Sequence, residues 1–356
     1  MNQDMTLNAL YAQHTGKTSD KWSIYLNIYD RILEPYKHSH IALLEIGVQN
    51  GGSLEIWSKY FKNATHLVGC DINPDCLKLE YEDTRISVVV GDANAESSQD
   101  AIKKHSEKYN IIIDDGSHQS SDIVKSFCYY FDLLCDGGVY VAEDLHCSYW
   151  QEFEGGLYDP FSSIAFFKAL IDIINYESWG VVQTRADRLN HFVDNYGVQL
   201  NEDLLSQIHS IEFINSVCVV RKKPSQQNLM GARIVVGELA SVAPAQKKLN
   251  GSVFWAMNQQ RNPTSANTQS ESVVYKKLAE LEQEITSLHS EIILHQQKTA
   301  QKISEVNETY ERKLLEEKQR TLESTRAYNS MLSSNSWRLT APARKLKNFL
   351  SKNRMK

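Results

Sequence analysis

The chain has 356 residues, of which 42% are hydrophobic and 23% charged, and its formal net charge is −6. This length allows one full-sized domain plus a further segment, and the negative charge excludes the electrostatic footprint of a nucleic-acid-binding protein. The six cysteines form no CxxC pair, and no run of residues resembles a signal peptide or a membrane span, so we expect a cytoplasmic protein with reduced cysteines.

The first elements in chain order are two predicted helices, over residues 7–14 and 22–33, in an N-terminal segment of residues 1–40. Strands and helices then alternate, which is the pattern of a doubly wound, mostly parallel α/β sheet. The predicted strands cover residues 42–46, 66–70, 86–90, 110–113 and 139–142. The helices cover residues 54–60, 97–108, 121–134 and 161–174. Three late strands are predicted at residues 181–184, 211–213 and 216–221, the last two as a hairpin near the end of the domain at residue 222.

The composition changes after Lys222. Residues 223–270 are rich in Gln, Asn, Ser, Pro and Gly and predict a loosely ordered linker. Residues 271–328 carry an apolar seam with steps of four and three, which predicts a coiled coil and a homo-oligomer, with a lone helix folded back on the domain as the alternative. The seam begins with Val274, Leu278, Leu281, Ile285, Leu288 and Ile292.

The last segment, residues 329–356, is a basic tail with apolar residues between its Arg and Lys residues. This pattern is typical of a helix that lies on an anionic membrane surface or docks to a partner. A frayed basic tail is the alternative.

Two acidic clusters each follow a predicted buried strand: Asp114-Asp115-Gly116-Ser117-His118 and Glu143-Asp144-Leu145-His146. Ligands of open α/β sheets bind at the carboxyl ends of the strands, so these clusters are expected to converge. So many carboxylates at one place are costly unless a cation lies among them, which predicts a divalent-metal site with a nearby base. In the alternative, Asp114 or Asp115 merely caps the next helix.

A glycine-rich turn joins the first strand to the next helix, in the sequence Glu45-Ile46-Gly47-Val48-Gln49-Asn50-Gly51-Gly52-Ser53. Glycines let a ligand approach the backbone closely. Asp71 ends the second strand, where it can accept hydrogen bonds from ribose hydroxyls, and Asp92 follows the third, where it can contact an adenine amino group. Together the three positions predict a nucleoside-type cofactor.

These residues carry a resemblance to a known family. The order of Glu45, Gly47, Asp71 and Asp92 resembles class I S-adenosylmethionine-dependent methyltransferases. More narrowly, LLEIGVQNGGSLEIW, IIIDDGSHQ and GGVYVAEDLHCSYW resemble the metal-dependent sugar O-methyltransferases of the macrocin and mycinamicin type, over roughly residues 10–222. That similarity includes an Asp-Lys-aromatic pattern in the N-terminal segment, which helps to close the pocket in the family.

The resemblance implies S-adenosylmethionine and Mg²⁺, or another divalent cation, as cofactors. It implies that Asp115, Glu143 and Asp144 hold the metal and that His118 is the base. The residues expected to bind the methyl donor are Glu45, Gly47, Gln49, Gly51, Ser53, Asp71, Asp92 and Asp114. His146 either orients a carboxylate or contacts the substrate, and Tyr149 and Trp150 either pack or stack on a sugar.

The segment from Ser334 to Arg344 resembles the S-x-S-W-R-L-T-x-P-x-R segment of bacterial surface-polysaccharide glycosyltransferases and their partners. It implies an O-methyltransferase acting on a sugar of an O-antigen-like polysaccharide or its lipid-linked precursor. It also implies a glycosyltransferase partner and a position at the inner face of the cytoplasmic membrane. The alternatives are a small-molecule or antibiotic-tailoring enzyme on the same scaffold, and a catalytically inactive coiled-coil scaffold of a polysaccharide assembly complex.

Overall fold

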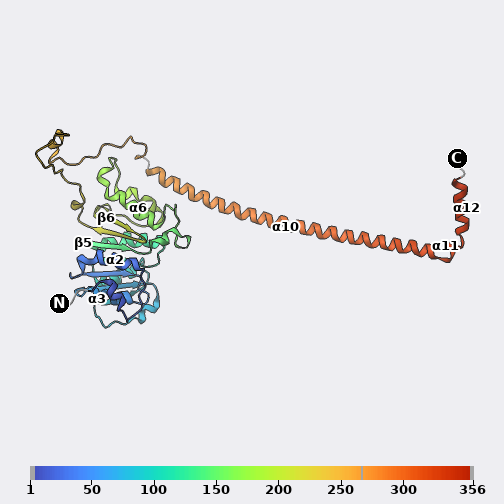
Figure 1. Ribbon diagram of the computed structural model, residues 1–356, viewed down its shortest axis with the longest axis horizontal. Coiled ribbons are helices and arrows are strands. Elements are labelled where there is room, and N and C mark those ends of the chain that lie inside the picture. Colours follow the sequence, from blue (N-terminus) through green and yellow to red (C-terminus); the bar gives the residue numbers. More distant parts are fainter. Residues whose placement is uncertain (1–4, 266–267, 353–356) are drawn as a thin grey trace. The chain divides into compact units, whose positions relative to one another are not determined.

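The computed structural model describes residues 5–265 and 268–352 (Figure 1). The chain falls into two compact units, Met1–Tyr275 and Lys276–Lys356. The first unit contains the predicted sheet and linker, and the second contains most of the predicted coiled coil and the tail. The last four residues of the predicted tail, 353–356, lie outside the described residues.

The first unit is built on a seven-stranded sheet with the order β3-β2-β1-β4-β5-β7-β6. Strands β1 to β5 are parallel to one another, and β7 runs antiparallel to both β5 and β6. The strands are β1 (Ala42–Ile46), β2 (His66–Asp71), β3 (Ile86–Val90), β4 (Tyr109–Asp114), β5 (Leu134–Ala142), β6 (Ile208–Ile214) and β7 (Val217–Lys222). The predicted α/β class, the five parallel strands and the terminal hairpin are confirmed.

Helices cover both faces of the sheet, so the central strands are buried on both sides. One apolar layer packs α1 (Leu7–Ala12), α2 (Ser23–Leu33) and α3 (Gly52–Tyr60) against residues such as Leu43 and Ile113. The other packs α5 (Ser120–Leu133) and α6 (Ser163–Ile174) against residues such as Leu44 and Ile112. Successive residues of one strand therefore point into opposite layers. The remaining helices of this unit are α4 (Glu96–His105), α7 (Arg185–Arg188), α8 (Asn190–Tyr196) and α9 (Glu202–Leu205).

The strand register brings the ends of the parallel strands to one edge. Ile46 at the end of β1 pairs with Cys70 of β2 on one side and with Asp114 of β4 on the other. Asp114 in turn pairs with Ala142 of β5. The loops that follow these strands carry the glycine-rich turn, Asp71 and both acidic clusters, so the predicted convergence is a consequence of the sheet order.

The strand predicted at residues 181–184 is wrong. The structure has bends there, and Val182 is 90% exposed. Thr184 is instead the N-cap of the short helix α7, and its side chain accepts a hydrogen bond from the Asp187 amide. The Asp187 carboxylate accepts one from the Thr184 amide in return, which completes a capping box. The two valines favoured a strand locally, but the cap decides the backbone conformation.

Lys222, at the end of β7, holds the C-terminal end of α5. Its side chain is buried and its ammonium donates hydrogen bonds to the carbonyl oxygens of Phe131, Asp132 and Leu134. The last carbonyls of a helix have no partner within the helix, so an outside donor stabilises them.

Replacing Lys222 by methionine should lower the free energy of unfolding by about 2 kcal/mol, because the replacement leaves buried carbonyls without donors. Denaturant titration followed by circular dichroism measures this change. The matched control is Lys223→Met at the next position, which should stay within about 0.5 kcal/mol of wild type. Equal stability of the two variants would contradict this role of Lys222.

After β7 the chain has little regular structure up to residue 265, apart from the short 3-10 helices η6 (Ser225–Asn228) and η7 (Pro244–Leu249). Most of its residues are exposed. The linker of residues 223–270 stays a prediction.

The second unit is dominated by α10 (Thr268–Ser333), a single uninterrupted helix (Figure 1). The predicted seam residues from Leu281 to Ile292 are each about half exposed in the single chain, whereas the side chains of Val274 and Leu278 lie outside the described residues. Two short helices follow, α11 (Asn335–Leu339) and α12 (Ala341–Lys352), so the described part of the basic tail is helical. Within the described residues, no helix combines the length and apolar character needed to cross a membrane.

Candidate active site

The glycine-rich turn lies tightly between the ends of β2 and β4. Gly47 has φ +91°, and a Cβ atom there would lie 1.9 Å from the Asp115 carbonyl oxygen. Asp71 fixes the turn, because its Oδ2 accepts hydrogen bonds from the amides of Val48 and Gln49, each at 2.8 Å. Glycine is therefore required at position 47 by both backbone conformation and space.

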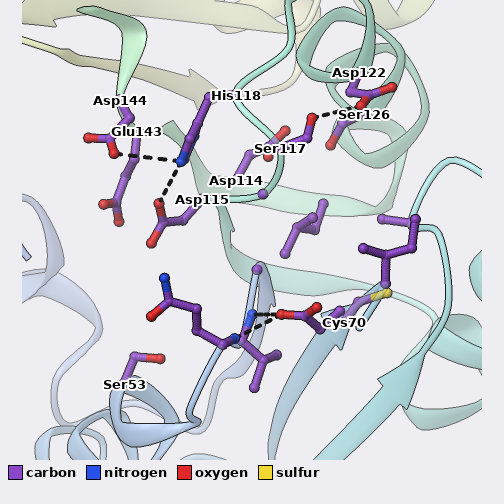
Figure 2. A pocket seen from close by; sticks show the side chains of 18 of the residues that line it. Ser53, Cys70, Asp114, Asp115, Ser117, His118, Asp122, Ser126, Glu143 and Asp144 are labelled. Atoms are coloured by element: carbon purple, nitrogen blue, oxygen red, sulfur yellow. Dashed lines mark hydrogen bonds and ion pairs between the residues drawn. The ribbon is translucent and has the colours of Figure 1, made fainter. Parts of the chain in front are cut away.

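A cavity of about 490 Å³ opens at this edge of the sheet (Figure 2). It is lined by most of the residues predicted to bind the methyl donor or the metal. These are Gly47, Gln49, Ser53, Asp71, Asp92, Asp114, Asp115, His118, Glu143 and Asp144. Residues 18–22 and Tyr25 of the N-terminal segment line the same cavity, and the pocket-closing role of this segment stays a prediction.

Three of the predicted site residues do not line the cavity: Glu45, Gly51 and His146. Glu45 is fully buried, and its carboxylate accepts hydrogen bonds from Ser53 Oγ at 2.6 Å and Trp57 Nε1 at 3.3 Å. It therefore ties the end of β1 to α3. Gly51 has φ +82° and is the N-cap of that helix.

Asp115, His118 and Asp144 form a compact group at the mouth of the cavity, called here the acidic trio. His118 Nε2 lies 3.6 Å from Asp144 Oδ2 and 4.0 Å from Asp115 Oδ1 (Figure 2). His118 and Asp144 have φ values of +59° and +53°, a backbone conformation that is uncommon for residues other than glycine. Each residue offers one possible metal-ligand atom, and these atoms lie within 4.8 Å of one another.

The donor set of the trio fits a divalent cation. Asp144 Oδ1 accepts a hydrogen bond from the Tyr25 hydroxyl at 2.6 Å, and Asp115 Oδ2 accepts one from Lys21. The other oxygen of each carboxylate faces His118. Two carboxylate oxygens and one imidazole nitrogen are ligands that Mg²⁺ or a first-row transition metal accepts.

Glu143 lies beside the trio but is held by the protein itself. It is 1% exposed, and Lys21 Nζ contacts its two oxygens at 2.8 and 3.0 Å. The Tyr29 hydroxyl donates a further hydrogen bond. Burial raises the pKa of Glu143 to about 8, and Asp115 adds to this effect, whereas Lys21 opposes it. Its place among the metal ligands stays a prediction.

Lys21, like Tyr25 and Tyr29, is a site residue that sequence reasoning did not single out. Its side chain is 3% exposed, and its ammonium pairs with Asp115 and Glu143 and lies 3.9 Å from Glu45 Oε1. Burial lowers the pKa of Lys21, but the three carboxylates outweigh it and hold the pKa well above its ordinary value. The Asp-Lys-aromatic pattern of residues 20–22 was the available signal. The Lys21 ammonium therefore supplies part of the positive charge that the sequence predicted among these carboxylates.

Asp114 and Asp115 do not cap the following helix, so that alternative is wrong. α5 begins at Ser120, and its N-cap Gln119 makes no side-chain capping bond. Asp114 is buried and accepts a hydrogen bond from the Tyr140 hydroxyl at 2.9 Å. Burial raises the pKa of Asp114 to about 6.

His146 is oriented by the hairpin between β6 and β7. Its Nδ1 lies 2.5 Å from Ser216 Oγ, which in turn lies 2.8 Å from the Tyr25 hydroxyl oxygen. Since the Tyr25 hydroxyl donates its hydrogen bond to Asp144, His146 is linked to the trio through these two hydroxyl groups. Both predicted roles of His146, orienting a carboxylate and contacting the substrate, stay predictions.

Replacing Lys21 by methionine should lower the free energy of unfolding by about 3 kcal/mol without added metal, because it leaves buried carboxylates without their counter-charge. Added Mn²⁺ should restore part of this loss, since a divalent cation can take over the neutralising role. Denaturant titrations with MnCl₂ and with EDTA measure both effects.

The matched control for Lys21→Met is Lys17→Met, which removes a partly exposed ammonium 2.8 Å from Glu55. The control should cost less than about 1 kcal/mol and should not respond to Mn²⁺. A Lys21→Met variant as stable as wild type in EDTA would contradict the neutralising role.

The strand order and the cavity at the carboxyl edge define a Rossmann-like methyltransferase fold. A solved structure of MycE methyltransferase from the mycinamycin biosynthetic pathway, in complex with Mg, SAH and mycinamycin VI, has a TM-score of 0.51 with this chain. The two are 24% identical, and the match covers 67% of this chain and 58% of that one. This likeness supports the fold.

At the sequence level, the chain is similar to sugar O-methyltransferases. It is 34% identical over 171 residues to the 8-demethyl-8-alpha-L-rhamnosyl tetracenomycin-C 2'-O-methyltransferase of Streptomyces olivaceus, covering 45% of this chain and 44% of that protein. It is 34% identical over 160 residues to the mycinamicin VI 2''-O-methyltransferase of Micromonospora griseorubida, covering 42% and 39%. The chain thus spans less than half the length of these relatives. No family model matches it.

Proposed function

We propose that the chain is a metal-dependent O-methyltransferase that transfers a methyl group from S-adenosylmethionine to a sugar hydroxyl. The observation that carries the proposal is the position of the acidic trio in the same cavity as the glycine-rich turn and Asp71. The similarity to sugar O-methyltransferases supports it. An inactive scaffold would not need to keep these residues together.

The glycine-rich turn and the ends of β2 and β3 are the proposed place of the methyl donor. Gly47 and Gln49 offer backbone groups at close approach, while Asp71 and Asp92 line the cavity beyond them. The methyl carbon of S-adenosylmethionine is already electrophilic, because it is bonded to a positively charged sulfur that can leave as a neutral thioether. The protein therefore has to position the acceptor and take up a proton.

Asp115 and Asp144 are the proposed metal ligands, with Glu143 behind them. A divalent cation held there lowers the pKa of a sugar hydroxyl and orients it. His118 Nε2 accepts the hydroxyl proton as the oxygen–methyl bond forms and the sulfur–methyl bond breaks. The products are a sugar methyl ether and S-adenosylhomocysteine, with the proton on His118.

The comparisons favour a glycosylated small molecule as the acceptor, which was the alternative, over the surface polysaccharide expected from the tail. Both sequence relatives are named for sugar-bearing small molecules. The polysaccharide remains a second candidate because of one observation. The chain has eight Arg or Lys residues and no Asp or Glu after Glu323, which gives the tail the charge needed to reach an anionic membrane carrying lipid-linked sugars.

Calorimetric titration of the purified chain with S-adenosylmethionine, in Mg²⁺ and then in EDTA, tests the proposal. We expect binding in both conditions, since the proposed donor site and the acidic trio use different residues. Activity on rhamnosyl glycosides would then favour the small-molecule acceptor, and activity only on lipid-linked glycans the polysaccharide. Absence of binding in both conditions would leave the scaffold alternative.

We also propose that α10 forms the predicted homo-oligomeric coiled coil, because its seam residues are half exposed in the single chain. Replacing Leu288 and Ile292 together by lysine should lower the molar mass measured by light scattering. The control replaces Ser287 and Ser290 by lysine, because these residues lie on the same turns of α10 but outside the seam. Unchanged mass of the seam variant would contradict the coiled coil.

A further inference from the structure

A continuous series of aromatic rings borders the acidic trio, and the methyl-transfer scheme above leaves most of it without a role. The ring centroids follow one another from Trp22 to His146 at 6.0 Å, to Trp150 at 5.1 Å, to Phe153 at 6.1 Å and to His118 at 6.3 Å. These five residues are called here the aromatic rim. The rim begins in the N-terminal segment, crosses the loops after β5 and ends at the proposed base.

The two tryptophans of the rim are unusually accessible. Trp22 is 61% exposed and Trp150 is 49% exposed. The segment between β5 and α6 also exposes Leu157 and Tyr158. Indole rings that served only for packing would be largely covered, and grouped exposed apolar side chains beside a cavity are typical of a binding surface.

The rim is held in place by polar contacts from several elements. The contact of His146 Nδ1 with Ser216 Oγ fixes the imidazole between the two indoles. The two residues that flank Phe153 in the sequence are also held. The Glu152 carbonyl accepts a hydrogen bond from Gln119 Nε2 at 3.0 Å, and the Glu154 carboxylate accepts one from the Ser121 amide at 2.9 Å. The loop is thereby tied to the start of α5, next to His118. An exposed surface that is nevertheless fixed is suited to binding a rigid ligand.

We propose that the aromatic rim is a stacking platform for the pyranose ring of the acceptor, an inference that rests on the function proposed above. A pyranose ring has apolar C–H faces and polar edges. An indole ring offers an apolar face for the former and an N–H donor for the latter. Because the rim ends at His118, a sugar stacked on it would direct a hydroxyl toward the acidic trio. The occupant is thus a sugar unit of a glycoside.

Saturation-transfer NMR on the full-length chain with Mg²⁺ and S-adenosylhomocysteine tests the proposal. The probes are the methyl glycosides of L-rhamnose, D-glucose, D-mannose and D-galactose. At least one should receive saturation at its ring C–H protons. Trp22→Ala and Trp150→Ala should each weaken its binding by roughly three- to tenfold. Trp150 is not among the residues lining the cavity, so Trp150→Ala should leave the S-adenosylhomocysteine affinity unchanged. Trp255→Ala, which removes an 80% exposed indole of the linker, is the matched control.

Two results would overturn the platform: no saturation transfer to any of the four glycosides, or glycoside binding that neither tryptophan variant weakens. The S-adenosylhomocysteine titration separates this failure from that of the proposed function. A chain that binds a glycoside through the rim but not S-adenosylhomocysteine would keep the platform and lose the methyltransferase. The opposite result would keep the methyltransferase and lose the platform.

Discussion

Replacing Asp115 by alanine should reduce turnover at least about 1,000-fold, because metal-ion catalysis is worth several kcal/mol of transition-state stabilisation. The affinity for S-adenosylmethionine should change less than about threefold, since the glycine-rich turn and Asp71 are left intact. Lys21 would still pair with Glu143 in this variant, so the site should remain folded. Steady-state kinetics and calorimetry on the same preparation measure the two quantities.

Two further variants serve as controls for Asp115→Ala. One keeps the size of the Asp115 side chain, and the other removes a carboxylate outside the acidic trio. Asp115→Asn keeps the side-chain volume and removes the charge, so it should lose nearly as much activity as the alanine variant. Asp75→Ala removes an exposed carboxylate that forms an ion pair with Lys78, and it should leave kcat unchanged. Loss of both turnover and cofactor affinity in Asp115→Ala would show that the metal assignment is wrong.

The sheet was predictable because each of its central strands is a short apolar run that ends at a polar or glycine residue. β1 and β3 begin and end at the predicted residues, and the other parallel strands differ mainly by extension. The convergence of the two acidic clusters followed from topology alone, since β4 and β5 are neighbours in the sheet. The two valines of residues 181–184 were misleading because β-propensity depends on packing in a sheet, whereas this exposed segment leads into the capping box of α7.

The contacts within the site were less predictable. Lys21 is 94 positions from Asp115 and 122 from Glu143, so no local pattern reports their pairing. Glu143 and Asp144 are adjacent and were predicted to act together, yet one points to Lys21 and Tyr29 and the other to His118. Neighbouring side chains at the end of a strand point in opposite directions, so adjacency in the sequence does not imply a shared role.

Lys21 and the acidic trio account for different parts of the negative charge at this site. A permanent ammonium neutralises the buried carboxylates on the inner side, where Glu143 and Glu45 are inaccessible to solvent. The oxygens of Asp115 and Asp144 that face His118 are the ones proposed above to hold a divalent cation. Because Lys21 already offsets part of the negative charge, such a cation would have less charge to offset.

Replacing His118 by alanine should lower kcat by roughly 10²–10⁴-fold, the usual contribution of a positioned general base. Metal affinity separates this role from ligation. If His118 only accepts the proton, Mn²⁺ binding followed by electron paramagnetic resonance should stay within about threefold of wild type, because the two carboxylates remain. If it is a ligand, affinity should fall about tenfold or more.

The matched control for His118→Ala is His66→Ala, an exposed imidazole at the start of β2 and therefore at the opposite end of that strand from Asp71. It should leave both kcat and Mn²⁺ affinity unchanged. A wild-type rate in the His118→Ala variant would show that another residue is the general base. His146 would then be the residue to test next, because its hydroxyl network already reaches Asp144 through Tyr25 and Ser216.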